Sequence, residues 1–133
     1  LTGNAIRVPT PNVSMAILNL SLTREVDRDQ VNEYLRNLAV HSAMQRQIDY
    51  TMSSEVVSSD FIGNRHAGIV DSLATIAEGK QVVLYVWYDN EFGYSCQVMR
   101  VAQKMGGVRY PIVPAQPAAE STVTERQAEL TAI

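Results

Sequence analysis

A single arginine stands alone near the start of the chain. Across residues 1–20, Arg7 is the only side chain with a charge, and its neighbours are apolar or small and polar. Removing a guanidinium from water is costly unless an anionic group meets it, and its planar fork of donors suits a phosphate or a carboxylate. Arg7 is therefore a candidate anion ligand. A structural ion pair with a carboxylate elsewhere explains the same pattern, and the residues alone favour that interpretation.

A second candidate is the aromatic-rich segment 87–95, which reads Trp-Tyr-Asp-Asn-Glu-Phe-Gly-Tyr-Ser. It lies where a predicted buried strand gives way to a helix, and the carboxyl ends of strands often form binding sites. The amide of Asn90 offers both a donor and an acceptor, so it can orient a planar amide such as the nicotinamide carboxamide. The simpler interpretation, which the residues alone favour, is that Asp89 or Asn90 caps the helix while the aromatic rings fill the core.

The other reactive side chains give weaker signals. Cys96 falls inside a predicted helix with no histidine nearby in sequence, so we expect a buried, inert thiol. His41 is predicted at a helix end and His66 in a turn, where a histidine is usually a surface or helix-dipole partner. The sequence has no metal-ligand spacing, and none of its seven glycines forms a nucleotide-binding motif. We therefore predict no catalytic nucleophile and no metal site in this chain.

Two strands are predicted at the start of the chain, at residues 2–8 and 13–22. Pro9 and Pro11 separate them, because each proline lacks an N–H donor and fixes φ, which stops a sheet ladder. A helix is then predicted to start after Asp27, with Gln30 as the partner in a capping box, and to end near residue 41 or 42. Its apolar stripe is Val31, Tyr34, Leu35, Leu38 and Ala39.

The second half of the sequence predicts short strands, one long strand and another helix. Residues 48–80 alternate β-prone runs with turns, which predicts a meander of short strands. Residues 81–88 predict a central strand that is buried on both faces. A helix is predicted over 91–105 and ends at the glycines 106–107. Its expected inward stripe is Tyr94, Val98, Val101, Ala102 and Met105.

The composition excludes several classes of protein. With 133 residues, 46% hydrophobic and 19% charged, the chain is neither disordered nor collagen-like, and no apolar run approaches the roughly 20 residues that span a bilayer. A net charge of −3, without basic blocks, argues against nucleic acid. One cysteine and no secretory signal predict a cytoplasmic protein. The chain begins without methionine in a predicted strand, so we expect part of a longer protein.

Four sequence blocks resemble one family. Residues 1–14, 49–51, 57–61 and 87–95 are similar, in order and spacing, to the C-terminal part of glyceraldehyde-3-phosphate dehydrogenases. The resemblance covers about residues 1–105. It implies an α+β fold with a mixed, mostly antiparallel sheet and helices packed on one face. We expect residues 1–107 to be part of the catalytic domain and 108–133, with prolines at every third position from 111 to 117, to be an extension.

The resemblance also implies roles for three residues. Arg7 corresponds to an arginine that contacts the substrate phosphate and inorganic phosphate, which reverses the preference for a structural ion pair. Asn90 corresponds to an asparagine that hydrogen-bonds the nicotinamide carboxamide, and Tyr94 to a tyrosine beside that ring. The implied protein is a cytoplasmic, glycolytic, NAD-dependent homotetramer that acts on glyceraldehyde 3-phosphate and inorganic phosphate. The family's nucleophilic cysteine, its partner histidine and its Rossmann domain all precede the segment seen here.

Two other functions remain open at this stage. Erythrose-4-phosphate dehydrogenase is a sister activity, and residues 5–7 and 66–71 have some of its character. Tyr88, Phe92 and Tyr94-Ser95 instead follow the glyceraldehyde-3-phosphate pattern. The third possibility is a non-catalytic assembly module, since the family's catalytic domain also builds its subunit interface. On any of these views, we expect this chain alone neither to bind NAD tightly nor to oxidise an aldehyde.

Overall fold

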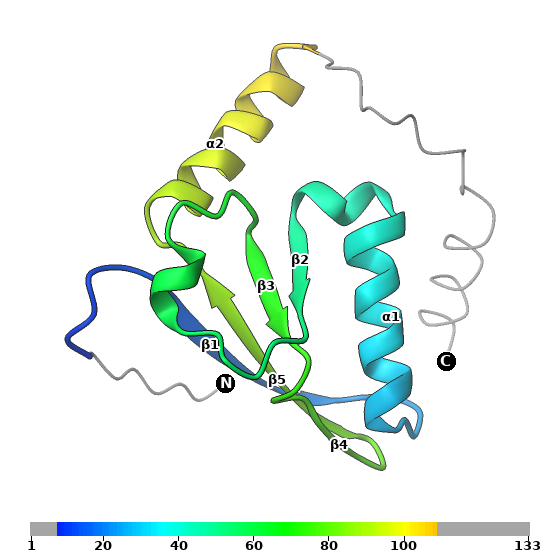
Figure 1. Cartoon of the computed structure of the whole chain (residues 1–133). Helices are drawn as coiled ribbons and strands as arrows, with labels where there is room; N and C mark the ends of the chain where they lie inside the picture. Colours follow the sequence, from blue (N-terminus) through cyan, green and yellow to red (C-terminus); the bar gives the residue numbers. More distant parts are fainter. Residues whose placement is uncertain (1–7, 109–133) are drawn as a thin grey trace.

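A mixed five-stranded sheet organises the chain in the computed structural model, which describes residues 8–108 (Figure 1). The strands run in the order β1 (Ser14–Ser21), β5 (Gln81–Tyr88), β3 (Gly68–Asp71) and β2 (Ile48–Thr51), and β4 (Ile76–Glu78) also pairs with β5. Every pairing is antiparallel except β2 with β3. This confirms the predicted α+β class and its mostly antiparallel sheet.

Some of the predictions fall on residues that the structure does not describe. Residues 1–7 and 109–133 lie outside the described part of the chain. Arg7, nearly all of the strand predicted at 2–8 and the extension predicted beyond residue 107, apart from Val108, therefore have no structural description here.

The longest strand pair joins the first strand of the described chain to the last. β1 and β5 pair over their full lengths, from Ser14 opposite Tyr88 to Ser21 opposite Gln81. The strand predicted at 81–88 is confirmed, but its complete burial on both faces is not. Val82 and Leu84 are buried, whereas Val83 and residues 85–88 are only half-buried and Gln81 is exposed. Burial of both faces requires a packed layer on each side of the sheet, but here the sheet is open enough that β1, beside β5, is mostly exposed, with Ile17 at 55%.

The first helix, α1 (Arg28–His41), is positioned as the sequence predicts. The Asp27 side chain accepts a hydrogen bond from the Gln30 backbone N–H (2.8 Å), and the Gln30 side chain accepts one from the Asp27 N–H (3.3 Å). This capping box satisfies two backbone donors that the first turn leaves unpaired. The stripe of α1 packs toward β2 and β4, with Ala39 buried and Tyr34 the most exposed of the set at 38%.

The middle of the chain contains short strands but is not a meander. β2 and β3 lie side by side in parallel, with Ile48 opposite Gly68. Parallel strands need a crossover connection, and here residues 52–67 provide it, including the short 3-10 helix η2 (Ser58–Phe61). A second 3-10 helix, η1 (Ala43–Arg46), links α1 to β2. The alternation of β-prone runs and turns does not distinguish these two arrangements.

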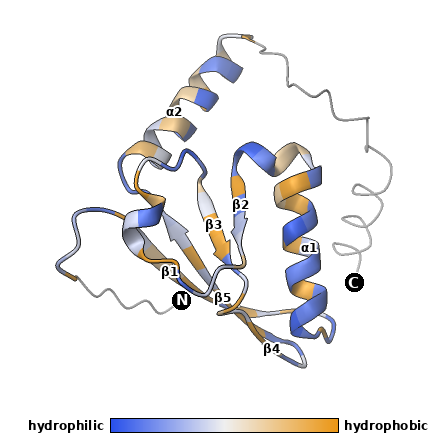
Figure 2. Cartoon of the chain, in the orientation of Figure 1, coloured by the Kyte–Doolittle hydropathy of each residue, from blue (hydrophilic) through white to orange (hydrophobic). Residues whose placement is uncertain are grey.

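The second helix, α2 (Phe92–Met105), ends where predicted, but the side of the helix that was predicted to face inward faces solvent. Gly107 has a φ of 70° and follows the last helical residues, as expected of a glycine stop. All five residues of the predicted inward stripe are exposed, with Val98 at 47% and Met105 at 84%. The helix projects beyond the sheet, so only its first turns meet the rest of the described chain (Figure 1). Figure 2 shows apolar residues along this projecting helix.

A small apolar cluster lies beneath the start of α2. Val13, Phe61 and Ile69 are buried together, with Trp87 packed against them. The rings of Phe61 and Trp87 are 5.4 Å apart at their centroids and inclined by 31°. Aromatic pairs at this separation add to the stability gained by burial alone. The cluster fixes the crossover segment to the end of β5.

Candidate functional site

The turn from β5 into α2 is built on a buried carboxylate. Asp89 is 1% exposed and accepts hydrogen bonds from the backbone N–H groups of Gly63 (2.8 Å), Glu91 (2.8 Å) and Phe92 (2.7 Å). Burial alone would raise the pKa of Asp89, but these hydrogen bonds and one from the Asn12 side chain lower it to about 2. Asp89 is thus an ionised anchor for the first turn of α2, as the capping interpretation predicts.

Asn90, the next residue, is exposed and oriented by the opposite strand. Its Oδ1 accepts a hydrogen bond of 2.9 Å from the hydroxyl of Ser14 at the start of β1. Because the oxygen is engaged, the Nδ2 donor of Asn90 is left for another acceptor, and it has no hydrogen-bond partner within residues 8–108. The amide is therefore held in one orientation before any ligand arrives.

The segment that carries Ser14 is held in a strained conformation. Val13 has a φ of 75°, which is unfavourable for a β-branched residue, and its side chain is buried in the apolar cluster. On one side of it, Asn12 hydrogen-bonds Asp89, and on the other Ser14 hydrogen-bonds Asn90. The strain is thus offset by contacts that fasten this segment to both polar residues of the turn.

A surface hollow of about 280 Å³ opens beside this turn. It brings together Asn90 and Tyr94, the two residues for which the resemblance implies contact with a cofactor. Tyr94 is 68% exposed, so its ring is available to a ligand. The full lining is Ala67, Tyr88, Asp89, Asn90, Tyr94 and Gln97. A donor held in a fixed orientation beside an exposed aromatic ring is suited to a planar, amide-bearing ring.

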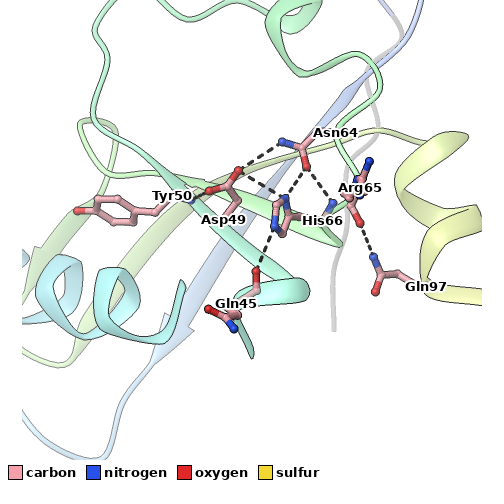
Figure 3. Close-up of polar contacts among 7 residues, drawn as sticks. All are labelled: Gln45, Asp49, Tyr50, Asn64, Arg65, His66 and Gln97. Carbon is pink, nitrogen blue, oxygen red and sulfur yellow. Dashed lines mark hydrogen bonds and ion pairs between the residues drawn. The ribbon is translucent and has the colours of Figure 1, made fainter. Parts of the chain in front are cut away.

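A polar network lies next to the hollow and joins three elements (Figure 3). His66 contacts the Asn64 Oδ1 through Nδ1 (2.8 Å) and the Gln45 carbonyl through Nε2 (3.1 Å). The same Nδ1 lies 3.5 Å from a carboxylate oxygen of Asp49. Gln97 of α2 donates to the carbonyl of Arg65 (3.1 Å). His66 is therefore a connecting residue rather than a simple surface histidine.

The remaining reactive side chains lie where the sequence predicts or close to it. Cys96 is on α2 and half-exposed, so the burial expected of it is only partial. His41 is in the last turn of α1, near the negative end of the helix dipole. Among residues 8–108, no group of three or more His, Cys, Asp or Glu side chains is arranged to hold a metal ion. None of the described helices is long and apolar enough to cross a bilayer.

Sequence reasoning did not identify Ser14, Asn12 and Gln97 as parts of this site. Ser14 could have been found by pairing the two predicted strands antiparallel, because that register puts it opposite Tyr88. The roles of Asn12 and Gln97 depend on contacts across 77 and 32 positions of the sequence, which no local pattern reveals. The mixed sheet with its two helices defines an α+β domain, and its candidate site lies where β5 leads into α2, at an oriented amide and an exposed aromatic ring.

Comparisons with known proteins identify the family. Residues 1–90 match the model of the glyceraldehyde 3-phosphate dehydrogenase C-terminal domain. The chain is 66% identical over 114 residues to a glyceraldehyde-3-phosphate dehydrogenase-like protein of Pseudomonas aeruginosa (strain UCBPP-PA14), covering 86% of this chain and 25% of that protein. It is 42% identical over 106 residues to glyceraldehyde-3-phosphate dehydrogenase of Echinococcus multilocularis, covering 79% of this chain and 31% of that enzyme.

This chain belongs to the glyceraldehyde 3-phosphate dehydrogenase C-terminal domain family, an oxidoreductase family. A relative in Saccharomyces cerevisiae, glyceraldehyde-3-phosphate dehydrogenase 1, is 44% identical over 100 residues, covering 74% of this chain and 30% of that enzyme. The chain thus spans between 25% and 31% of the length of these three curated relatives.

Proposed function

We propose that this chain is the C-terminal part of the catalytic domain of a phosphorylating, NAD-dependent glyceraldehyde-3-phosphate dehydrogenase. The observation that carries the proposal is the hollow in which Asn90 and Tyr94 meet, with the Asn90 amide oriented by Ser14. Family membership supports it, because relatives in Echinococcus multilocularis, Bacillus subtilis and Saccharomyces cerevisiae carry that dehydrogenase name. The whole protein would be a cytoplasmic homotetramer of glycolysis.

In this proposal, each described residue has a limited task. The Nδ2 of Asn90 donates to the carboxamide of a bound nicotinamide, which fixes the face that the ring presents, and Tyr94 packs beside the ring. NAD, when bound, supplies the hydride acceptor. Asp89 does not transfer protons, because its carboxylate is buried, ionised and fully engaged in hydrogen bonds. Its task is to hold Asn90 at the start of α2.

Arg7 would contribute a substrate contact in the same protein. We propose that its guanidinium binds the phosphate of glyceraldehyde 3-phosphate and inorganic phosphate. The support is its isolation in a nearly uncharged stretch, where a bidentate anion compensates its charge. The nucleophilic cysteine, the partner histidine and the Rossmann domain would come from residues outside this chain. Cys96, the one cysteine here, lies in α2 and is not proposed as the nucleophile.

The test is an amide substitution in the protein made from the whole reading frame. Asn90→Leu removes the donor and keeps the branching of the side chain, and we expect the KM for NAD to rise about tenfold, the value of one hydrogen bond of about 1.4 kcal/mol. The KM for the aldehyde should change little. Asn37→Leu, on the exposed face of α1, is the matched control. An unchanged KM for NAD in Asn90→Leu would remove the cofactor role.

Turnover assays on the same protein distinguish the proposed activity from the two alternatives. Turnover of glyceraldehyde 3-phosphate should exceed that of erythrose 4-phosphate, and the reverse order would favour the sister activity. Absence of any turnover, from a reading frame without an upstream Ser-Cys-Thr-Thr-Asn-Cys block, would favour the assembly module instead. An intact-mass measurement of the natural protein establishes which chain is being assayed.

A further inference from the structure

The ring of His66 meets hydrogen-bond acceptors through both of its nitrogens (Figure 3). Nδ1 lies 2.8 Å from Oδ1 of Asn64, and Nε2 lies 3.1 Å from the backbone carbonyl oxygen of Gln45 in η1. A neutral imidazole carries a proton on only one nitrogen, whereas the imidazolium form donates from both. Neutral His66 can therefore donate to Asn64 or to Gln45, but not to both.

The orientation of the Asn64 amide makes its oxygen an acceptor toward the ring. Asn64 Oδ1 also accepts a hydrogen bond from the backbone N–H of His66 (2.9 Å), and Asn64 Nδ2 donates to Oδ2 of Asp49 (3.4 Å). The reverse orientation would place Nδ2 against that N–H and Oδ1 against the carboxylate. The carbonyl of Gln45 can only accept, so both ring nitrogens need a proton, and only protonated His66 satisfies both contacts.

A carboxylate of β2 lies beside the ring and favours its protonated form. Asp49 Oδ2 is 3.5 Å from His66 Nδ1, and the two side chains are only 41% and 24% exposed, so solvent screens their attraction only in part. Asp49 is the one carboxylate within ion-pair distance of the ring among residues 8–108. It supplies the negative charge that a protonated His66 requires.

The other elements around the ring also carry charged or titratable groups. Arg46 ends η1, Arg65 precedes the histidine in the loop, and Cys96 and Arg100 lie on α2. The positive charges of the arginines oppose protonation of the ring. Arg46 and Arg65 are exposed, where water and salt screen their charges, whereas Asp49 acts at close range. The carboxylate therefore has the larger effect on the ring.

The loop that carries His66 forms part of the wall of the hollow beside α2. Ala67, the next residue, lines the hollow, and so does Gln97, which donates to the carbonyl of Arg65 (3.1 Å). A Cβ added to Gly93 would lie 2.8 Å from the carbonyl oxygen of His66, so the loop also touches the first turn of α2. A change in how the ring holds the loop therefore reaches the hollow.

We propose that His66 is a pH-sensitive switch, whose protonated form attaches the loop at 63–67 to η1 and β2 and so holds one wall of the hollow. A contact that needs the protonated form is complete below about pH 6.5, where a free histidine titrates, and is lost as the pH rises above it. The switch depends only on the contacts of the ring, so it does not require that the hollow binds NAD.

The test is hydrogen exchange of the loop, followed by mass spectrometry on the ligand-free protein made from the whole reading frame. The N–H groups of Ala67 and Gly68 both donate to the carbonyl of Gln47 at the end of η1 (2.7 and 3.3 Å), so their protection reports whether the loop is attached there. After correction for the chemical exchange rate, we expect this protection to fall about tenfold between about pH 5.5 and about pH 8.5, as for the loss of one hydrogen bond.

Two variants separate the charge of the ring from its packing. His66→Gln keeps one amide donor but cannot be protonated, so its loop protection should be about tenfold lower at about pH 5.5 and should not change with pH. Asp49→Asn removes only the carboxylate beside the ring and keeps an acceptor for the Tyr50 N–H, so it should reduce the change with pH. His41→Gln removes the other histidine, in the last turn of α1, and is the matched control that should keep the change.

Protection over α1 in the same samples shows whether each variant is folded. Loop protection in the parent protein that stays constant or rises with pH would overturn the proposal. An equal fall with pH in His66→Gln would overturn it as well, and so would disappearance of the fall in His41→Gln, because the change would then arise from another group.

Discussion

At the residue scale, the site depends on how two adjacent polar residues divide their roles. Asp89 is buried and structural, whereas Asn90 is exposed, and its Nδ2 donor has no hydrogen-bond partner among residues 8–108. The difference arises because the backbone N–H groups of Gly63, Glu91 and Phe92 converge on the carboxylate and leave the amide outside. A carboxylate with this many donors is stabilised in its ionised form.

Asp89 should therefore make stability depend on acidity. Its folded pKa of about 2 lies below the ordinary value of 3.8, so its contribution is complete above about pH 4 and is lost as the pH falls toward 2. The contribution is about 2 kcal/mol. Asp89→Asn should lower the free energy of unfolding by about this amount at pH 7, measured by urea denaturation. The fall in the free energy of unfolding between pH 4 and 2 should also be smaller in Asp89→Asn than in the parent chain.

Asp29→Asn is the matched control for this prediction, because Asp29 is highly exposed on α1 and pairs only weakly with Arg28. The free energy of unfolding of Asp29→Asn should match that of the parent chain at pH 7 and between pH 4 and 2. A fall in the free energy of unfolding below pH 4 that is as steep in Asp89→Asn as in the parent chain would contradict the anchoring role.

At the element scale, the sequence predicts the helices and strands whose signals lie in their own residues. It does not predict features that depend on contact with another segment of the chain. The helix α1 is predicted because Asp27 and Gln30 form a capping box within four residues. The strand β5 is predicted because its composition is consistent over 81–88. The side of α2 that faces the rest of the chain is not predicted, since the apolar stripe is exposed and the side that meets the loop at 63–67 carries Gly93 and Gln97.

That side of α2 is in close contact with the loop. Gly93 is buried, and a Cβ added to it would lie 2.8 Å from the carbonyl oxygen of His66 and 3.2 Å from that of Asn64. Both are backbone atoms, which cannot move aside as a flexible side chain does. The absence of a side chain at Gly93 is thus what allows α2 to meet this loop.

Gly93→Ala should separate the helix from the loop. We expect a loss of about 1–3 kcal/mol in the free energy of unfolding, as for other overpacked contacts, with denaturant curves as the measurement. Gly106→Ala is the control, since an added Cβ there would come no closer than 3.4 Å, to the Ala102 carbonyl. Equal stability of the two variants would show that α2 is positioned by other contacts.

At the scale of the whole molecule, the described chain leaves large apolar side chains exposed on α2 and on β1. Val98, Val101 and Met105 are exposed along α2, and Ile17 and Leu18 along β1. Exposed apolar patches of this kind usually mark contacts with other protein surfaces. They agree with the proposal that the rest of a longer protein covers this chain.

The isolated chain should consequently associate with itself. We expect its apparent mass in light scattering to rise with concentration and to fall again in Val101→Glu, which puts a charge in the apolar stripe. Gln103→Glu adds the same charge on the less exposed side of α2 and is the control. A monomer at every concentration would mean that the exposed stripe has no tendency to bind another protein surface.

The candidate site is also assembled from segments that lie far apart in the sequence. The residues of one hollow come from the turn after β5, from α2 and from the loop before β3, and Asn90 is oriented by β1. The resemblance identified Asn90 and Tyr94 from one continuous motif, but the supporting contacts of Ser14 and Gln97 appear only when distant segments are folded together. Such supporting residues have no signature of their own in a single sequence.

The most direct test of the central proposal is an activity measurement on two proteins. Phosphate-dependent reduction of NAD with glyceraldehyde 3-phosphate should be absent from the purified, mass-verified 133-residue chain and present in the product of the whole reading frame. That result would agree with a chain that supplies nicotinamide and phosphate contacts but no nucleophile. Turnover by the 133-residue chain alone, or its absence from a whole protein that contains the nucleophilic cysteine, would contradict the account.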